Sequence, residues 1–215
     1  MAPETCRDEF GADRLFTQGT FRDDDDRLAG GNTTYSNLLE IVDASLSTVW
    51  EQAFREVFDE EFVAPDIEPF AGRAPACAPD PDLDLVNCPD ERLVAFDERD
   101  LTRPAYRLGD FAVATAVALP YSLSARAQLG LSTDDEEAVR SALCLTGWYA
   151  AKVYNEQAGE DILISPGDID ESVLFLLTYG RDPDVVPDVA LSGFQQVDLF
   201  RAGFTRGLRA CGVGA

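Results

Sequence analysis

Apolar residues recur at helical spacing in five segments of the chain, and a sixth segment has the composition of a β-strand. The strand segment, Arg92–Asp97, contains β-prone residues and is short enough for the edge of a sheet. The pattern therefore predicts an α+β fold that is mainly helical with a small β element. The helical segments are residues 35–62, as two short helices or one bent helix, and residues 109–130, 133–157, 165–180 and 193–204.

The segment 109–130 is expected to be the central helix. Residues Phe111–Ala118 are almost wholly apolar and rich in alanine, which is typical of a buried helix, and Asp110 stands near its N-terminus. Pro120 removes one backbone donor and predicts a kink or a local opening. We expect this helix to pack between the 133–157 helix and the N-terminal and C-terminal helices.

Two parts of the chain lack a helical pattern. Residues 1–34 carry few apolar groups and include the run Asp23–Asp26, which predicts an extended or partly disordered acidic arm before a single domain of residues 35–215. Residues 63–90 contain half of the twelve prolines together with Cys77 and Cys88. They are expected to form a surface loop that needs a covalent cross-link to hold it in place.

Composition narrows the class of partner. The chain has 40 acidic and 17 basic residues and a formal net charge of −23, which disfavours nucleic acid and anionic membrane surfaces. Any charged partner is expected to be basic, and the alternative is that the acidity serves solubility or high salt. No apolar run is long enough to span a membrane.

The cysteines bear on the compartment. There are five cysteines, no histidine and no C-x-x-C pair, which favours disulfides in an oxidising compartment over a metal site. Residues 1–20 have no secretory signal pattern. We therefore expect an extracytoplasmic protein whose leader or anchor is absent from this chain, with a cytosolic protein as the alternative.

The central segment also resembles a known enzyme family. Phe111–Ala114, Ala118–Leu123 and Gly130 follow the frame of the active-site helix of the bacterial neutral zinc metallopeptidases of the YpfJ type. That family reads F-A-x-A, three residues, and A-H-E-x-x-H, followed by a glycine. The resemblance implies a zincin-like fold.

The residues that would carry the chemistry of that family are replaced. Leu119 and Leu123 stand at the two zinc-binding histidines, and Pro120 stands at the general-base glutamate. In the 133–157 helix, Cys144 matches the family pattern, whereas Val139 stands at the third zinc ligand. Because catalytic zinc needs three protein ligands and the chain has no histidine, the resemblance implies a degenerate site with neither metal nor cofactor.

Framework residues of the family recur in the same order over roughly residues 38–211. The best matched stretches are Ser47–Phe54, Ser165–Glu171 and Gly193–Phe204. In this family an edge strand lines the substrate cleft. By that analogy we expect the vacated cleft to be filled by apolar side chains such as those of Leu119 and Leu123, and its lining to include Leu93, Phe96, Tyr121 and Trp148.

Five cysteines leave the pairing open on sequence alone. The family tends to keep cysteines at the positions of Cys144 and Cys211, and Cys77 and Cys88 bracket a proline-rich segment. The resemblance therefore implies the bridges Cys77–Cys88 and Cys144–Cys211, with Cys6 left over in the arm.

Three functions fit these observations. The leading interpretation is a catalytically inactive metallopeptidase homologue that binds a peptide or protein, or serves as a scaffold subunit of a cell-envelope assembly. The second is a hydrolase that uses the carboxyl groups of Asp110, Asp168 and Glu171. The third is a calcium-binding module that uses the N-terminal acids.

Overall fold

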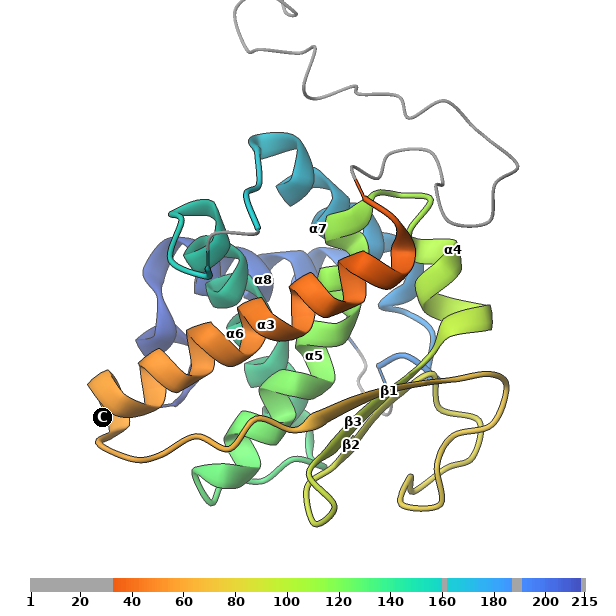
Figure 1. Ribbon diagram of the computed structural model, residues 1–215, viewed down its shortest axis with the longest axis horizontal. Helices are drawn as coiled ribbons and strands as arrows, with labels where there is room; N and C mark the ends of the chain where they lie inside the picture. Colours follow the sequence, from red (N-terminus) through yellow and green to blue (C-terminus); the bar gives the residue numbers. More distant parts are fainter. Residues whose placement is uncertain (1–32, 160–161, 187–190, 214–215) are drawn as a thin grey trace, which may run out of the picture.

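The computed structural model describes residues 33–159, 162–186 and 191–213. Within these residues the chain is mainly helical with one three-stranded sheet, which confirms the α+β class (Figure 1). The elements, in chain order, are α3 (Tyr35–Ala53), η1 (Phe54–Phe58), β1 (Asp66–Phe70), β2 (Leu85–Cys88), β3 (Leu93–Asp97), η2 (Glu98–Thr102), α4 (Arg103–Ala105), α5 (Asp110–Gln128), α6 (Glu136–Tyr154), α7 (Pro166–Tyr179), α8 (Gly193–Arg206) and η3 (Leu208–Cys211).

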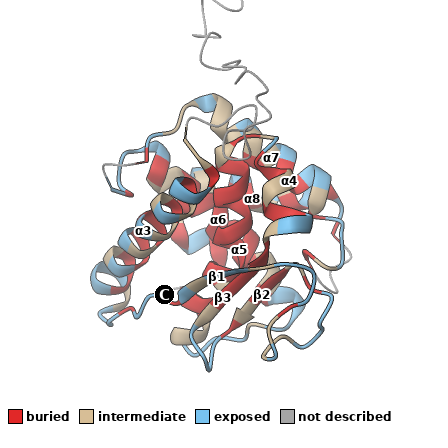
Figure 2. Ribbon diagram, turned by 45° about the vertical axis from the view of Figure 1, so that its right-hand side comes forward, coloured by how far each residue is buried: buried red, intermediate tan, exposed pale blue. Residues whose placement is uncertain are grey.

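The predicted central helix is α5, which runs without interruption through Pro120. It is buried along nearly its whole length and lies in the middle of the molecule (Figure 2). Its neighbours are α6, α7, α3 and the sheet. The C-terminal helix α8 packs mainly against α6 and then α7, so the expected direct packing of the C-terminal helix on α5 is corrected. The apolar surface of α5 is wide enough that four other elements are needed to cover it.

The helix starts follow their capping signals. Asp135 caps α6 and accepts a hydrogen bond from the backbone N–H of Ala138 at 2.7 Å, a little after the expected start at residue 133. Ser165 precedes α7, and Pro166 occupies its first turn as predicted. The first helical segment is one helix, α3, extended by the π-helical turn η1.

The sheet differs from the expectation. Its strand order is β1-β3-β2, with β1 parallel and β2 antiparallel to β3. The predicted strand β3 is therefore central, and β2 is an edge. Two strands of the 63–90 segment were missed because β1 is mostly exposed and contains Pro69, which an edge strand tolerates, while β2 is only 4 residues long.

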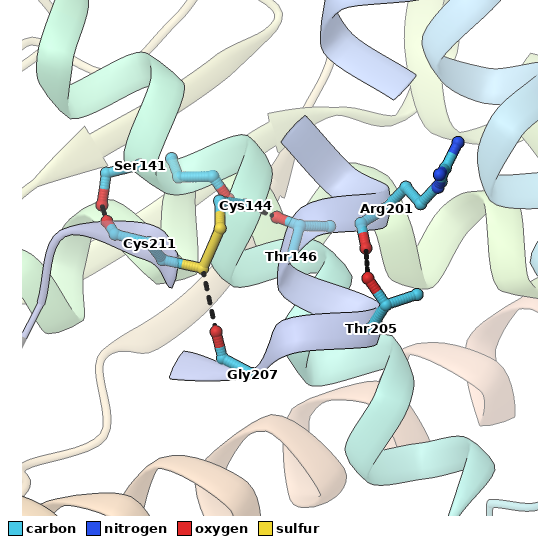
Figure 3. The surroundings of a disulfide bond; sticks show 8 residues. Ser141, Cys144, Thr146, Arg201, Thr205, Gly207 and Cys211 are labelled. Carbon is cyan, nitrogen blue, oxygen red and sulfur yellow. Dashed lines mark hydrogen bonds between the residues drawn. A yellow bond between two sulfur atoms is a disulfide. The ribbon is translucent and has the colours of Figure 1, made fainter. Parts of the chain in front are cut away.

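Two disulfides fix the fold, and both pairings are those that the resemblance implied. Cys77 is bonded to Cys88, beside the sheet, and Cys144 of α6 is bonded to Cys211 of η3 (Figure 3). The hydroxyl of Ser141 donates to the backbone carbonyl of Cys211 at 2.6 Å. The last helical turn is thereby held against α6 by a covalent bond and a buried hydrogen bond.

The predicted acidic arm, with Asp23–Asp26 and Cys6, lies outside the described residues except at its end. Thr34 caps α3 by accepting the N–H of Asn37 at 3.3 Å, and Thr33 accepts a hydrogen bond from the hydroxyl of Tyr106. These two residues therefore belong structurally to the domain. In the described part of the chain, no helix has the length and apolarity needed to cross a membrane.

Candidate functional site

The residues at the degenerate motif positions lie together at one cleft. Leu119, Pro120 and Leu123 of α5 and Val139 of α6 all line a cleft of about 640 Å³. Leu119 and Leu123 are four residues apart, so they lie on one face of the helix. Two consecutive helices thus bring four positions singled out by the resemblance to a single place.

The inner surface of the cleft is largely apolar. Edge strand β2 contributes Leu85 and Val86, helix α6 contributes Ala142, and the segment before β2 contributes Leu83. The other apolar residues of the lining are Pro79, Pro183, Val185 and Val186. Such a surface offers contact with apolar groups and no lone pair for a metal ion.

Acidic residues surround this apolar surface. They come from three separate segments, and no lysine or arginine is among the described residues that line the cleft. The carboxylates of the lining outnumber the nearby cations, of which the buried Arg126 is one, so they produce a net negative potential that a low-dielectric wall strengthens. The acidic residues of the lining are Asp80, Asp134, Asp135, Glu136 and Asp184.

A buried arginine positions one side of this acidic rim. Arg126 of α5 is only 3% exposed, and its Nε donates to the backbone carbonyl of Ser132 at 3.1 Å. The Ser132 hydroxyl donates to Oδ1 of Asp134 at 3.0 Å. Burial lowers the pKa of the Arg126 guanidinium, while the nearby charges of Glu137 and Asp135 favour its ionised form. The rim before α6 is therefore tied to the central helix.

Asp84 stands between two lining residues, Leu83 and Leu85, but is not itself part of the described lining of the cleft. Its backbone N–H donates to the carbonyl of Asp184 at 2.7 Å and so joins the two segments. Burial, followed by repulsion from Asp97, Asp182 and other acids, raises the pKa of the Asp84 carboxyl to about 6. Burial is thus the main obstacle to the ionisation of Asp84, and the charges of the surrounding acids add to it.

Several expectations about the cleft are corrected. The cleft is open, not filled by Leu119 and Leu123, which form part of its wall. Tyr121 is fully buried elsewhere and shares a hydrogen bond with the hydroxyl of Ser47 at 3.0 Å. None of the four residues expected to line the cleft belongs to its described lining, and these are Leu93, Phe96, Tyr121 and Trp148.

The reason for these errors is the direction of the side chains. Tyr121 is two positions from Leu119 and Trp148 is nine positions from Val139, which places each on roughly the opposite face of its helix. Trp148 packs instead against Trp50, with ring centroids 5.1 Å apart. Phe96 and Leu93 lie on β3, the central strand, and the edge strand β2 lines the cleft instead.

Sequence reasoning also missed Asn87 of β2, a residue of the cleft lining. Both polar atoms of its side-chain amide are enclosed, and neither has a hydrogen-bond partner in the structure. An enclosed amide without partners costs free energy. The only sequence signal was a polar residue between Val86 and Cys88 in an otherwise apolar run.

The three carboxyl groups proposed for a hydrolase also lie together, at a different place. Ligand atoms of Asp110, Asp168 and Glu171 are all within 4.8 Å of one another. Asp110 opens α5 and is nine residues from Leu119, roughly 13 Å along the helix axis. The described lining of the cleft includes none of the three.

Local capping accounts for this carboxyl cluster. Oε2 of Glu171 accepts the backbone N–H of Phe111 at 2.9 Å. Gly109, which has a positive φ, leaves room for this carboxyl group because a Cβ atom on it would lie 1.9 Å from Cδ of Glu171. Oδ2 of Asp168 accepts the N–H of Ser165 at 2.5 Å. Carboxyl groups are favoured at helix N-termini, so the cluster joins the starts of α5 and α7.

Burial is also the main cause of the unusual titration of Glu171. It raises the pKa of this carboxyl to about 9, and the charges of Asp110 and Asp168 act in the same direction. Carboxyl groups this close cannot all ionise at moderate cost. Glu171 is therefore a neutral acid at pH 7 and provides an uncharged link between two helices.

Comparison with known proteins gives no assignment. No known protein family, no curated protein and no solved structure matches the chain.

Proposed function

We propose that this chain is a non-catalytic, metallopeptidase-like protein whose cleft binds a peptide or a segment of another protein. The observation that carries the proposal is the meeting of Leu119, Pro120, Leu123 and Val139 at one cleft. The resemblance selected these positions from the sequence, and the packing of α5 against α6 brings them to one surface. A zincin-like arrangement of α5 and α6 would bring them together.

The chemistry of the cleft favours binding over hydrolysis. The side chains of Leu119, Leu123 and Val139 have no lone pair for zinc, and Pro120 has no group that could act as a base. The chain contains no histidine that could replace them. A cleft that keeps its volume but has apolar walls is suited to holding side chains of a ligand.

Edge strand β2 supports a peptide ligand. It pairs with β3 on one side, and no strand of the described residues pairs with its other side. An edge strand beside a cleft can add main-chain hydrogen bonds to an extended segment, while the cleft accepts its side chains. The two disulfides favour an extracytoplasmic setting, where such bonds persist, and a role in a cell-envelope assembly fits that setting.

The proposal is tested by rebuilding the zinc site. The combined variant Leu119→His, Pro120→Glu, Leu123→His and Val139→Glu should retain one zinc per chain after buffer exchange, as measured by elemental analysis. The matched variant with Val139 unchanged has only two strong ligands and should lose the metal. Circular dichroism and disulfide mapping check that both variants fold.

The unmodified protein should hold no stoichiometric zinc and should cleave no peptide. One zinc per chain in that protein would contradict the degenerate site. A folded four-residue variant that stays free of zinc would show that these positions do not have zincin geometry.

A further inference from the structure

We infer that the ligand of this cleft is a peptide segment in which apolar anchor residues are flanked by lysine or arginine. This inference rests on the proposed function, because it names the partner of the same cleft. It is drawn from the combination of an apolar inner surface with an acidic rim that contains no described lysine or arginine.

The inner surface sets the apolar part of the ligand. Leu119, Leu123, Val139 and the valines at 185 and 186 face a volume of about 640 Å³, which is in the range of pockets that enclose a substantial ligand. Transfer of an aliphatic side chain from water to such a surface contributes about 25 cal/mol for each Å² of apolar area removed from water. Leucine-sized anchors are therefore the favoured contact.

The rim sets the charge of the flanking residues. Asp134 and Glu136 stand on one segment, and Asp80 and Asp184 stand on two others, so acids approach the cleft from several directions. The tie from Arg126 to Ser132 holds the first of these segments in place.

Other macromolecular occupants fit this charge less well. A second copy of the chain also carries a net charge of −23, and nucleic acid and anionic membranes are repelled in the same way. A free cation lacks the apolar part that the inner surface requires. The extended peptide is favoured because β2 is an edge strand and three of its consecutive residues, Leu85, Val86 and Asn87, line the cleft.

The test uses the full chain and three short labelled peptides of equal length. The first has adjacent leucines between lysine pairs, the second has glutamates in place of the lysines, and the third has serines in place of the leucines. Fluorescence anisotropy should show saturable binding of the first peptide alone, weakened by added salt. Equal binding of the first two would overturn the inference and leave the cleft as a binding site.

Variants separate the cleft from general charge attraction. Leu123→Trp, which fills the cleft, should abolish binding of the first peptide, and Asp134→Asn with Glu136→Gln should weaken it on the order of fivefold or more. Asp170→Asn with Asp198→Asn changes the net charge equally at positions outside the cleft lining and should have little effect. The inference would be overturned if both charge variants lost the same affinity for the first peptide, or if the unmodified protein did not bind that peptide. The rebuilt zinc site tests the proposed function separately.

Discussion

Gly147 of α6 and Gly203 of α8 allow the backbones of the two helices to touch. A Cβ atom on Gly203 would lie 1.7 Å from the carbonyl oxygen of Cys144, and a Cβ on Gly147 would lie 1.8 Å from that of Phe200. Each glycine thus faces backbone atoms of the other helix. No side chain fits at either position without separating α6 from α8.

Gly203→Ala should lower the free energy of unfolding by about 2 kcal/mol or more, although alanine is the better helix former. The added methyl group must displace backbone, which cannot move as a side chain does. Gly193→Ala is the control, because its Cβ would meet the flexible end of Leu177 at 3.0 Å. Urea denaturation measures both, and equal stability of the two variants would contradict the close crossing.

The two disulfides should differ in their effect on stability. Replacing Cys144 and Cys211 by alanine removes a bridge with a sequence separation of 67 and should cost about 4 kcal/mol, whereas replacing Cys77 and Cys88 removes one with a separation of 11 and should cost about 3 kcal/mol. Thermal unfolding under non-reducing conditions gives the order. Peptide mapping of the unmodified protein checks the pairing, and free thiols at Cys144 and Cys211 would contradict it.

Glu171 should make the protein less stable as pH rises. Its pKa is raised from 4.5 to about 9, so the folded state binds more protons than the unfolded state between these values. The contribution of this carboxyl is therefore greatest below pH 4.5 and is lost progressively as pH increases to 9, with a slope of up to about 1.4 kcal/mol per pH unit.

Glu171→Gln removes this titration and keeps an acceptor for the N–H of Phe111. Urea denaturation at a series of pH values should show that the free energy of unfolding of the variant rises relative to that of the unmodified protein from pH 5 to 9. Asp170→Asn, at an exposed neighbouring position, is the control: it removes one of the lesser charges that raise the pKa of Glu171 and leaves the Glu171 carboxyl able to titrate. A stability difference that did not change with pH would contradict a neutral Glu171.

We expect Asn87 to lower the stability of the free protein and to contribute to peptide binding. Asn87→Val removes two enclosed polar atoms that have no partner and suits a β-strand, so the free energy of unfolding should rise by about 1–2 kcal/mol. Denaturation measures this gain, and the leucine–lysine peptide tests whether binding falls. A variant of lower stability would show that the amide has partners that the free structure does not contain.

Residue patterns predicted the helices, and the resemblance singled out four positions that line one cleft. Helical periodicity is local, so α5, α6, α7 and α8 could be located from their own residues and capping signals. The cleft required the relative placement of Leu119 and Val139, which the resemblance supplied. The core direction of Tyr121 and Trp148 depends on helix rotation, and no local pattern determines it.

The sheet and the carboxyl cluster could not be predicted from local residue patterns. β1 and β2 are short, and their pairing with β3 is a tertiary event held near the Cys77–Cys88 bridge, so neither strand has a strong local signal. Asp110 and Asp168 stand in the first turns of α5 and α7, and Glu171 follows in α7. Their proximity, and the burial of Glu171 over Gly109, arise only when α5 and α7 pack together.

The contact between Gly147 and Gly203 also sets an order for the maturation of the chain. During synthesis α6 emerges well before α8, and its glycine face stays bare until the segment that ends at Cys211 is available. A polypeptide that ended before Gly203 would leave the glycine face of α6 uncovered and could not form the Cys144–Cys211 bridge.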